Sequence, residues 1–480
     1  MQKSVRSGIG EMSEFNNAEQ LIRTVVKDQS LVTTAGKVKT KHVLKSKLIR
    51  DSFNYFLSKA IPGLMGLFSV LVFVRLVGNA EYGRYSVLFA IVTACTAGLS
   101  GWLPQGILRY FSMSQTELEA ARFKSATLLG SVISILVGTL VLGVALWVER
   151  QPLRDSLLAV LLLAGGMLYG VFLIELQAML HSGSVAYFEA LRTISAFVLP
   201  VCVVLLAGRK TAEVLLAGAL AGYVIPLLVA HGKKQFRNAI LQGGPRQQSW
   251  KKEVGVLKTI WAYGWPVGVW SMCLTSQSAI DRYFIQRYAG SANAGSYAAL
   301  YDVIVRSFSL LCFPLVMSSN SLVMERWNSG DREGAVSLIR SSLKYQVAIS
   351  LLFFLALSLL ARQVSHLILG SKAELNSSLV LPLAIGGFLW QISYLVHKPL
   401  ELMCLTKRML TGMMVALALS VAGNYAFIPV YGYPAAAYVA IAAPLTYLLA
   451  VACLTPWSEF RRAASIPAVA LVDGKTNQFD

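Results

Sequence analysis

Charged and metal-binding side chains are scarce in this chain. Only 14% of its 480 residues are charged, and its five histidines are scattered. The six cysteines all lie in apolar stretches, and none belongs to a C-x-x-C pair, the spacing typical of zinc sites and redox centres. We therefore predict neither a metal site nor a disulfide framework, and interpret the cysteines as small packing residues.

Sequence motifs of enzymes are also missing. The chain has no nucleophile elbow, no phosphate-binding loop and no pair of carboxylates in a polar segment. Its longest internal polar loop is the 232–258 segment, whereas membrane-embedded glycan polymerases and ligases place their polar catalytic groups in soluble domains or long outward loops. We predict a protein without catalytic residues that is not an enzyme.

Apolar residues, in contrast, are abundant. They make up 55% of the chain, and the mean hydropathy is +0.59. A helix that crosses a bilayer needs roughly 20 mostly apolar residues. Twelve runs meet this requirement, six in each half of the sequence: 55–77, 85–107, 125–148, 156–180, 187–207, 212–231, 259–286, 296–319, 344–361, 378–399, 409–430 and 434–455. The predicted fold class is an all-α polytopic membrane protein with about 12 transmembrane helices.

The net charge of +19 is explained by membrane topology rather than by a nucleic-acid partner. Of the 43 lysines and arginines, 31 lie in the two tails and in alternate links between the runs, all of which fall on one side of the membrane. Cytoplasmic loops of membrane proteins carry this excess of positive charge. Both termini are therefore predicted to be cytoplasmic, with no nucleic acid among the partners.

A repeated segment links the two halves. Residues 75–90 (RLVGNAEYGRYSVLFA) are echoed 212 residues later by residues 287–302 (RYAGSANAGSYAALYD), each between two apolar runs. The shared positions are Arg75/Arg287, Gly78/Gly290, Ala80/Ala292, Gly83/Gly295, Tyr85/Tyr297 and Leu88/Leu300. Such internal repeats are common in membrane transporters, with the substrate path between the repeats. We expect Gly83 and Gly295 to serve the tight turns of these links.

The repeat divides the chain into two six-helix lobes. We assign residues 1–50 to a basic cytoplasmic tail, 51–231 to the N-lobe with spans 1–6, and 232–258 to a basic cytoplasmic loop between the lobes. Residues 259–456 form the C-lobe with spans 7–12, and 457–480 form a second cytoplasmic tail.

Three segments carry a resemblance to a known family. GNAEYGRYS (78–86), the 318–345 segment after the eighth span, and NYAFIPVYGYPAAAYVA (424–440) resemble the bacterial oligosaccharide flippases of the multidrug/oligosaccharidyl-lipid/polysaccharide exporter superfamily. The last segment is similar to the family pattern N-x3-IP-x-YG-x2-AA, and the chain departs from the family in its long basic tail and in Pro434.

The resemblance implies a MATE-like fold with a central cavity that opens to each side in turn. It further implies movement of undecaprenyl-diphosphate-linked oligosaccharide repeat units across the bacterial cytoplasmic (inner) membrane, for surface polysaccharide or exopolysaccharide biosynthesis. The implied partners are this lipid-linked oligosaccharide, the lipid bilayer, and polysaccharide polymerase and export proteins.

Charged residues inside spans are costly and are therefore candidates for function. For binding an anionic cargo the basic candidates are Arg306, Lys59 and Arg282. Snorkelling to the membrane surface is the competing interpretation for Lys59 and Arg282. Arg306 also lies four residues after Asp302 on one helix face, so mutual neutralisation of these two is its competing interpretation.

No bound cofactor is predicted, but transport can be coupled to an H⁺ or Na⁺ gradient. The carboxylates placed for coupling are Asp302, Asp281 and Glu175. Two other functions stay open. A multidrug or cation antiporter could use the same scaffold, and a membrane-embedded glycan polymerase or ligase is the second alternative.

Overall fold

The structure is a computed structural model, and it describes residues 56–111, 117–179, 181–232, 250–370, 374–403 and 405–464. The predicted amino-terminal tail, residues 1–50, and most of the 232–258 loop lie outside the described residues. From Ser58 onward the described residues belong to one compact unit. The lobe boundaries therefore stay a prediction.

The first half of the chain forms a series of long helices. The first helix covers Phe56–Val77. It is followed by α2 (Asn79–Ser100), α3 (Trp102–Tyr110), α4 (Glu117–Val148), α5 (Leu153–Ala178), α6 (Ser182–Ala207) and α7 (Ala212–Gly232). Leu, Val and Ala dominate these helices, which satisfy their backbone hydrogen bonds internally as a membrane interior requires.

The second half repeats this plan and adds short segments. Its helices are α9 (Trp250–Ala289), α10 (Ser291–Asn328), α11 (Arg332–Leu359), α12 (Ala361–Leu369), α13 (Val380–Val396), α14 (Lys398–Leu402), α15 (Thr406–Tyr431), α16 (Ala435–Leu454) and α17 (Trp457–Ala464), with a 3₁₀ turn η3 (Glu374–Leu379) before α13. Helix α9 begins inside the predicted 232–258 loop, and α17 lies inside the predicted carboxy-terminal tail.

Eleven helices of the described part of the chain are long and apolar enough to cross a membrane. The one predicted span outside this set is the seventh, 259–286, which is helical within α9 but is too polar to belong to it. Its polar side chains face protein instead of lipid, because Gln277, Asp281 and Arg282 are all at most 5% exposed. The protein is thus an all-helical, multi-pass membrane protein, as predicted.

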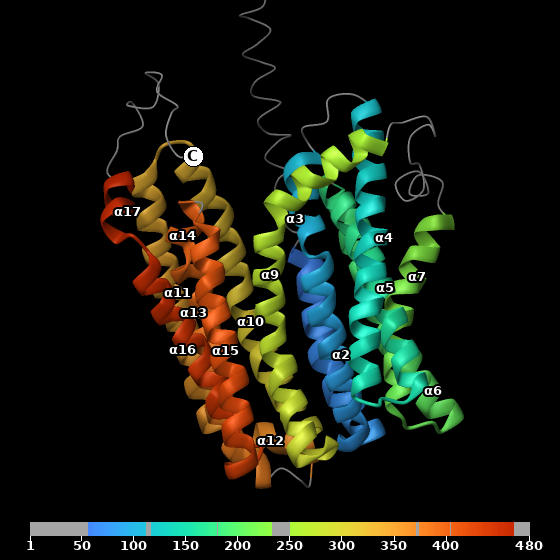
Figure 1. Ribbon diagram of the computed structural model, residues 1–480. Helices are drawn as coiled ribbons and strands as arrows, with labels where there is room; N and C mark the ends of the chain where they lie inside the picture. The colour runs from blue at the N-terminus through green and yellow to red at the C-terminus, as the bar shows by residue number, and fades with distance from the viewer. Residues whose placement is uncertain are drawn as a thin grey trace, which may run out of the picture. The chain divides into compact units, whose positions relative to one another are not determined.

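The two halves of the sequence meet along α2, which packs against α9 and α10 (Figure 1). The repeated links, one at the start of α2 and the other at the start of α10, adopt the same conformation. Gly78 has φ 84° and ψ 165°, and Gly290 has φ 86° and ψ 164°. Positive φ favours glycine, and each of these residues lets the chain turn directly into the next helix. We call this the link end of the protein.

Gly83 and Gly295 do not serve the turns, which corrects the expectation from sequence. Both lie one turn inside their helices, where α2 and α10 cross with their backbones in contact. A Cβ added to Gly83 would lie 2.8 Å from the nitrogen of Gly295, and a Cβ on Gly295 would lie 2.9 Å from the nitrogen of Gly83. Asn79 Nδ2 also donates a 2.7 Å hydrogen bond to Ser296 Oγ across this crossing. The repeated glycines therefore hold the two halves together at the link end.

The halves are also in contact at the opposite end of α2. There α3 packs against α9, and a Cβ on Gly268 would lie 2.9 Å from the backbone nitrogen of Trp102. The two halves are therefore in contact near both ends of α2.

Candidate functional site

A polar cavity of about 180 Å³ lies between the halves. The first helix, α2, α9 and α10 form its walls, so each half contributes two helices. Its lining residues are Gly66, Ser69, Val70, Phe73, Tyr82, Tyr85, Ser86, Phe89, Ala90, Thr93, Ser278, Arg282, Asp302 and Arg306. Three of the six candidate residues thus share one cavity.

Arg282 and Asp302 form the closest ion pair of the cavity. Arg282 Nη2 lies 2.6 Å from Asp302 Oδ1, with both side chains largely buried at 6% and 13% exposure. Arg282 Nη1 donates a 2.8 Å hydrogen bond to Ser86 Oγ, and its guanidinium carbon lies 5.7 Å from the centre of the Tyr301 ring. Anion, hydroxyl and ring together compensate the cost of burying this cation.

Arg306 is held more loosely. Its Nη2 lies 3.9 Å from Asp302 Oδ2, and 39% of its side chain is exposed. Its guanidinium lies against the backbone of Gly66 in the first helix, because a Cβ at Gly66 would collide with Arg306 Nη1 and lie 3.3 Å from Cζ. Arg306 is therefore the more accessible cation of the cavity.

The charges of the cavity all come from the second half of the chain. Two guanidinium groups face one carboxylate, so the lining carries one excess positive charge. The first half supplies hydroxyls and rings instead, including Ser86, Thr93 and Tyr85. Tyr82 OH lies 3.4 Å from Asp302 Oδ2, to which it donates a long hydrogen bond. An arrangement of this kind suits an anion that also bears hydrogen-bonding groups.

The other three candidate residues lie outside this cavity. Lys59 is exposed near the start of the first helix. Asp281 is 3% exposed and accepts hydrogen bonds from Tyr297 OH at 2.8 Å and from Asn424 Nδ2 at 2.7 Å. Glu175 is buried in the first half, where Thr127 Oγ1 lies 3.2 Å from its Oε1. These two carboxylates are therefore separate from the three charges between the halves.

One interpretation from sequence is wrong, because Arg282 does not snorkel to the membrane surface but is buried and paired with Asp302. The expected pair of Asp302 with Arg306 on one helix face is present at 3.9 Å, but the closer partner of Asp302 is Arg282 on the neighbouring helix, at 2.6 Å. Sequence spacing identified the i, i+4 neighbour, but it carries no signal for a pair formed between two helices.

Sequence reasoning also missed Gly66, Tyr82 and Ser86. Gly66 permits the close approach of Arg306. The hydroxyl of Tyr82 donates a hydrogen bond to Asp302, and the hydroxyl of Ser86 accepts one from Arg282. Tyr82 and Ser86 lie within the 78–86 segment that resembles the flippase family. A search of that segment for polar side chains on one helix face would have found them.

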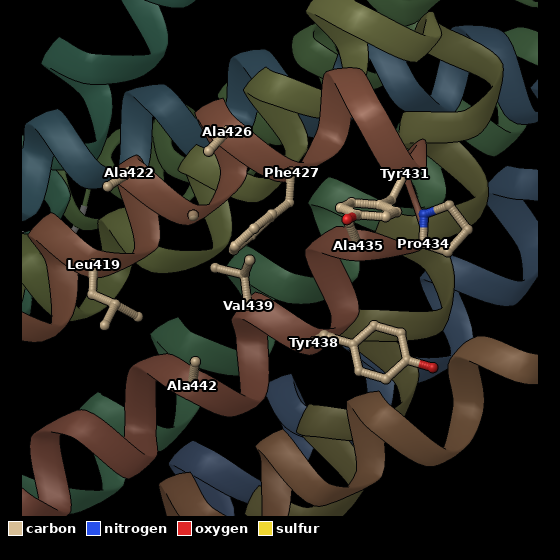
Figure 2. A pocket seen from close by; sticks show the side chains of 11 residues that line it. Leu419, Ala422, Ala426, Phe427, Tyr431, Pro434, Ala435, Tyr438, Val439 and Ala442 are labelled. Atoms are coloured by element: carbon tan, nitrogen blue, oxygen red, sulfur yellow. The ribbon is translucent and has the colours of Figure 1, made fainter.

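A second hollow lies between α15 and α16 and differs in character. It measures about 720 Å³, and its lining contains no charged side chain. Figure 2 shows Phe427 and Tyr431 from α15 and Val439 and Tyr438 from α16 around it. The remaining lining residues are Leu419, Ala422, Gly423, Ala426, Pro434, Ala435 and Ala442. This hollow offers no cation to an anionic ligand.

Solved structures with the same fold are membrane transporters. The lipid II flippase MurJ in an inward closed conformation matches with a TM-score of 0.65 at 15% identity, over 89% of this chain and 94% of MurJ. An outward-facing multidrug resistance MATE family transporter of the MOP superfamily matches with a TM-score of 0.59 at 16% identity, over 88% of this chain and 96% of that one.

A third similar structure is a MOP superfamily transporter from Pyrococcus furiosus, described as having a binding pocket of reversed polarity. It matches with a TM-score of 0.59 at 17% identity, over 90% of this chain and 97% of that one. No protein-family model and no curated protein sequence matches the chain. At these identities the likeness establishes the fold, and both flippases and multidrug transporters share it.

Proposed function

We propose that the protein is a flippase that moves undecaprenyl-diphosphate-linked oligosaccharide repeat units from the inner to the outer leaflet of the bacterial cytoplasmic membrane. The observation that carries this proposal is the excess positive charge of the cavity between the halves. A diphosphate is an anion whose oxygens match the planar fork of an arginine. Arg306, with its exposed guanidinium, is the residue assigned to bind it.

The cavity volume bears on the mechanism. At about 180 Å³ it is smaller than the roughly 300–1,000 Å³ of ordinary ligand pockets, and an oligosaccharide does not fit inside. Cargo must therefore enter and leave by separation of the halves, first at one end of α2 and then at the other. The contacts of Gly83 with Gly295 and of α3 with α9 are those that open in turn.

The competing function is a multidrug or cation antiporter, since MATE transporters share the fold. A site for organic cations requires an excess of carboxylate, because like charges repel. In the described cavity the single carboxylate is already paired with Arg282. The charge balance therefore favours an anionic cargo. Polysaccharide polymerase and export proteins would receive this cargo at the outer leaflet.

Asp281 is the carboxylate best suited to ion coupling. It accepts hydrogen bonds from the neutral side chains of Tyr297 and Asn424, whereas Asp302 is paired with arginine. A buried carboxylate with neutral partners gains from binding a proton or Na⁺. We assign Asp281 to gradient coupling, ahead of Glu175 and Asp302.

The experiment uses the full-length protein in liposomes that contain undecaprenyl-diphosphate oligosaccharide. We expect the protein to move this lipid between leaflets, the Arg306→Ala variant to move it at least about tenfold more slowly, and neither to transport ethidium. Arg326→Ala is the matched control, since Arg326 lies on the same helix outside the cavity and is 48% exposed. Ethidium transport without lipid movement would overturn the proposal in favour of the cation antiporter.

A further inference from the structure

The two oxygens of Asp302 have different surroundings. Oδ1 is bound to Arg282 at 2.6 Å, while Oδ2 faces Arg306 at 3.9 Å and Tyr82 OH at 3.4 Å. One oxygen is therefore fixed by a buried cation, and the other is directed at the accessible cation of the cavity. An anion that binds Arg306 must therefore share this guanidinium with Asp302 Oδ2 or displace that oxygen from it.

We propose that Asp302 competes with the anionic cargo for binding to Arg306. This inference rests on the proposed function and assigns a role to each charge of the cavity. Arg306 binds the phosphate, Asp302 Oδ2 competes with the phosphate for Arg306, and Arg282 is a positioning residue that keeps the carboxylate in place.

The geometry makes this competition reversible. When a phosphate takes Arg306, Asp302 keeps the 2.6 Å contact to Arg282 and the hydroxyl of Tyr82, so the displaced carboxylate is not left without partners. Its return to Arg306 then assists release of the cargo. Asp302 thereby lowers affinity and raises turnover, which a carrier that must release its cargo requires.

A purely structural pair predicts something different. If Asp302 only balanced the arginines during folding, removing its charge would lower protein abundance and would not strengthen anion binding. The distinction can be measured with inorganic pyrophosphate, which carries the diphosphate chemistry without lipid or sugar.

Calorimetric titration of the purified full-length protein with inorganic pyrophosphate tests the inference. We expect Asp302→Asn to bind pyrophosphate about tenfold more tightly than the unaltered protein, since a competing charge near 4 Å is removed. In liposomes the same variant should show a lower KM for the lipid-linked cargo together with a lower kcat. The matched control is Glu189→Gln, which removes a carboxylate that pairs with Arg192 at 3.0 Å in the first half and lies outside the cavity.

The double variant Asp302→Asn with Arg282→Gln keeps the test decisive if the single variant does not accumulate. It removes the buried pair without leaving a lone charge, and it should also bind pyrophosphate more tightly than the unaltered protein. Equal or weaker binding in the folded variants, with pyrophosphate binding intact in the unaltered protein, would overturn the competitor role and leave the flippase proposal standing. Failure of pyrophosphate to bind to any of the proteins would overturn both.

Discussion

The two halves of the chain are alike at the link end and unlike in the cavity. At the link end Gly78 and Gly290 have φ and ψ within a few degrees of each other, and Gly83 and Gly295 contact one another reciprocally. In the cavity, positions 212 residues before Arg282, Asp302 and Arg306 hold Val70, Ala90 and Ala94. These three positions lack charge altogether.

The repeat thus preserves the glycine crossing of the two halves but not the charged residues of the cavity. A crossing of two helices about a pseudo-twofold axis needs the same small residue on both sides. A site for one anion needs charge on one wall only, and neutral hydroxyls on the other wall let the cargo bind without a second set of buried ions. The link end therefore keeps the features that the two halves share, and the cavity holds the charges on which the proposed anionic cargo depends.

The largest effect is expected at the crossing of α2 and α10. Gly83→Val and Gly295→Val should each abolish transport and should do so to the same extent, because either side chain forces the two backbones apart. Transport is measured beside the membrane level of each variant. Gly143→Val is the control, since a Cβ at Gly143 has no atom within 4 Å. Unequal effects of the two variants would break the symmetry argued for this end.

The next effect concerns the buried cation of the cavity. Arg282→Ala leaves Asp302 without its close partner and should cost about 3–5 kcal/mol, as removal of one member of a buried pair does. Membrane abundance and the midpoint of thermal unfolding should both fall. Arg306→Ala should change neither, because the 2.6 Å pair is untouched. Equal destabilisation by the two variants would contradict the division of roles between them.

A smaller effect is expected at Gly66, which lines the cavity from the first half of the chain, where the lining is uncharged. Gly66→Ala places a methyl group against the Arg306 guanidinium and should reduce transport several-fold at normal abundance. The reduction should disappear in an Arg306→Ala background, where nothing is left to displace. Gly170→Ala is the control, because a Cβ there has no atom within 4 Å. An additive loss in the double variant would show that Gly66 acts through the helix instead.

The smallest effect is expected for Lys59. Its side chain is exposed and does not line the cavity, so Lys59→Ala should export cargo at the rate of the unaltered protein. A large loss of export at normal abundance would show that Lys59 contacts the cargo, and that the first half also contributes a basic residue to the site.

The architecture could be predicted from sequence because its signals are local. Apolar run length is read within a few tens of residues, and the repeat is found by comparing two short segments. The orientation inferred from the placement of lysine and arginine stays a prediction. α9 shows where this reasoning ends. Its polar residues reduce the hydropathy of the span, and only packing against α2, α10 and α15 explains how a membrane protein accommodates them.

The site could be predicted in part for the same reason. Arg306, Arg282 and Asp302 were identified because charge inside an apolar run is unusual. The closest partner of Asp302 lies on the preceding helix, 20 residues before it, and spacing along one helix carries no signal for such a contact, which is why Arg282 was placed at the membrane surface. Lys59 shows the converse, since a lysine near a span end meets the same criterion without reaching the cavity.

The most direct measurement is export of lipid-linked oligosaccharide by cells that carry Arg306→Ala, made beside the level of the protein in the membrane. We expect normal abundance, lost export and accumulation of the lipid-linked oligosaccharide on the cytoplasmic leaflet. Arg306→Lys should restore export poorly, because an ammonium group lacks the planar fork. Normal export by Arg306→Ala, or a loss that merely follows a fall in abundance, would contradict the assignment of the cavity to an anionic cargo.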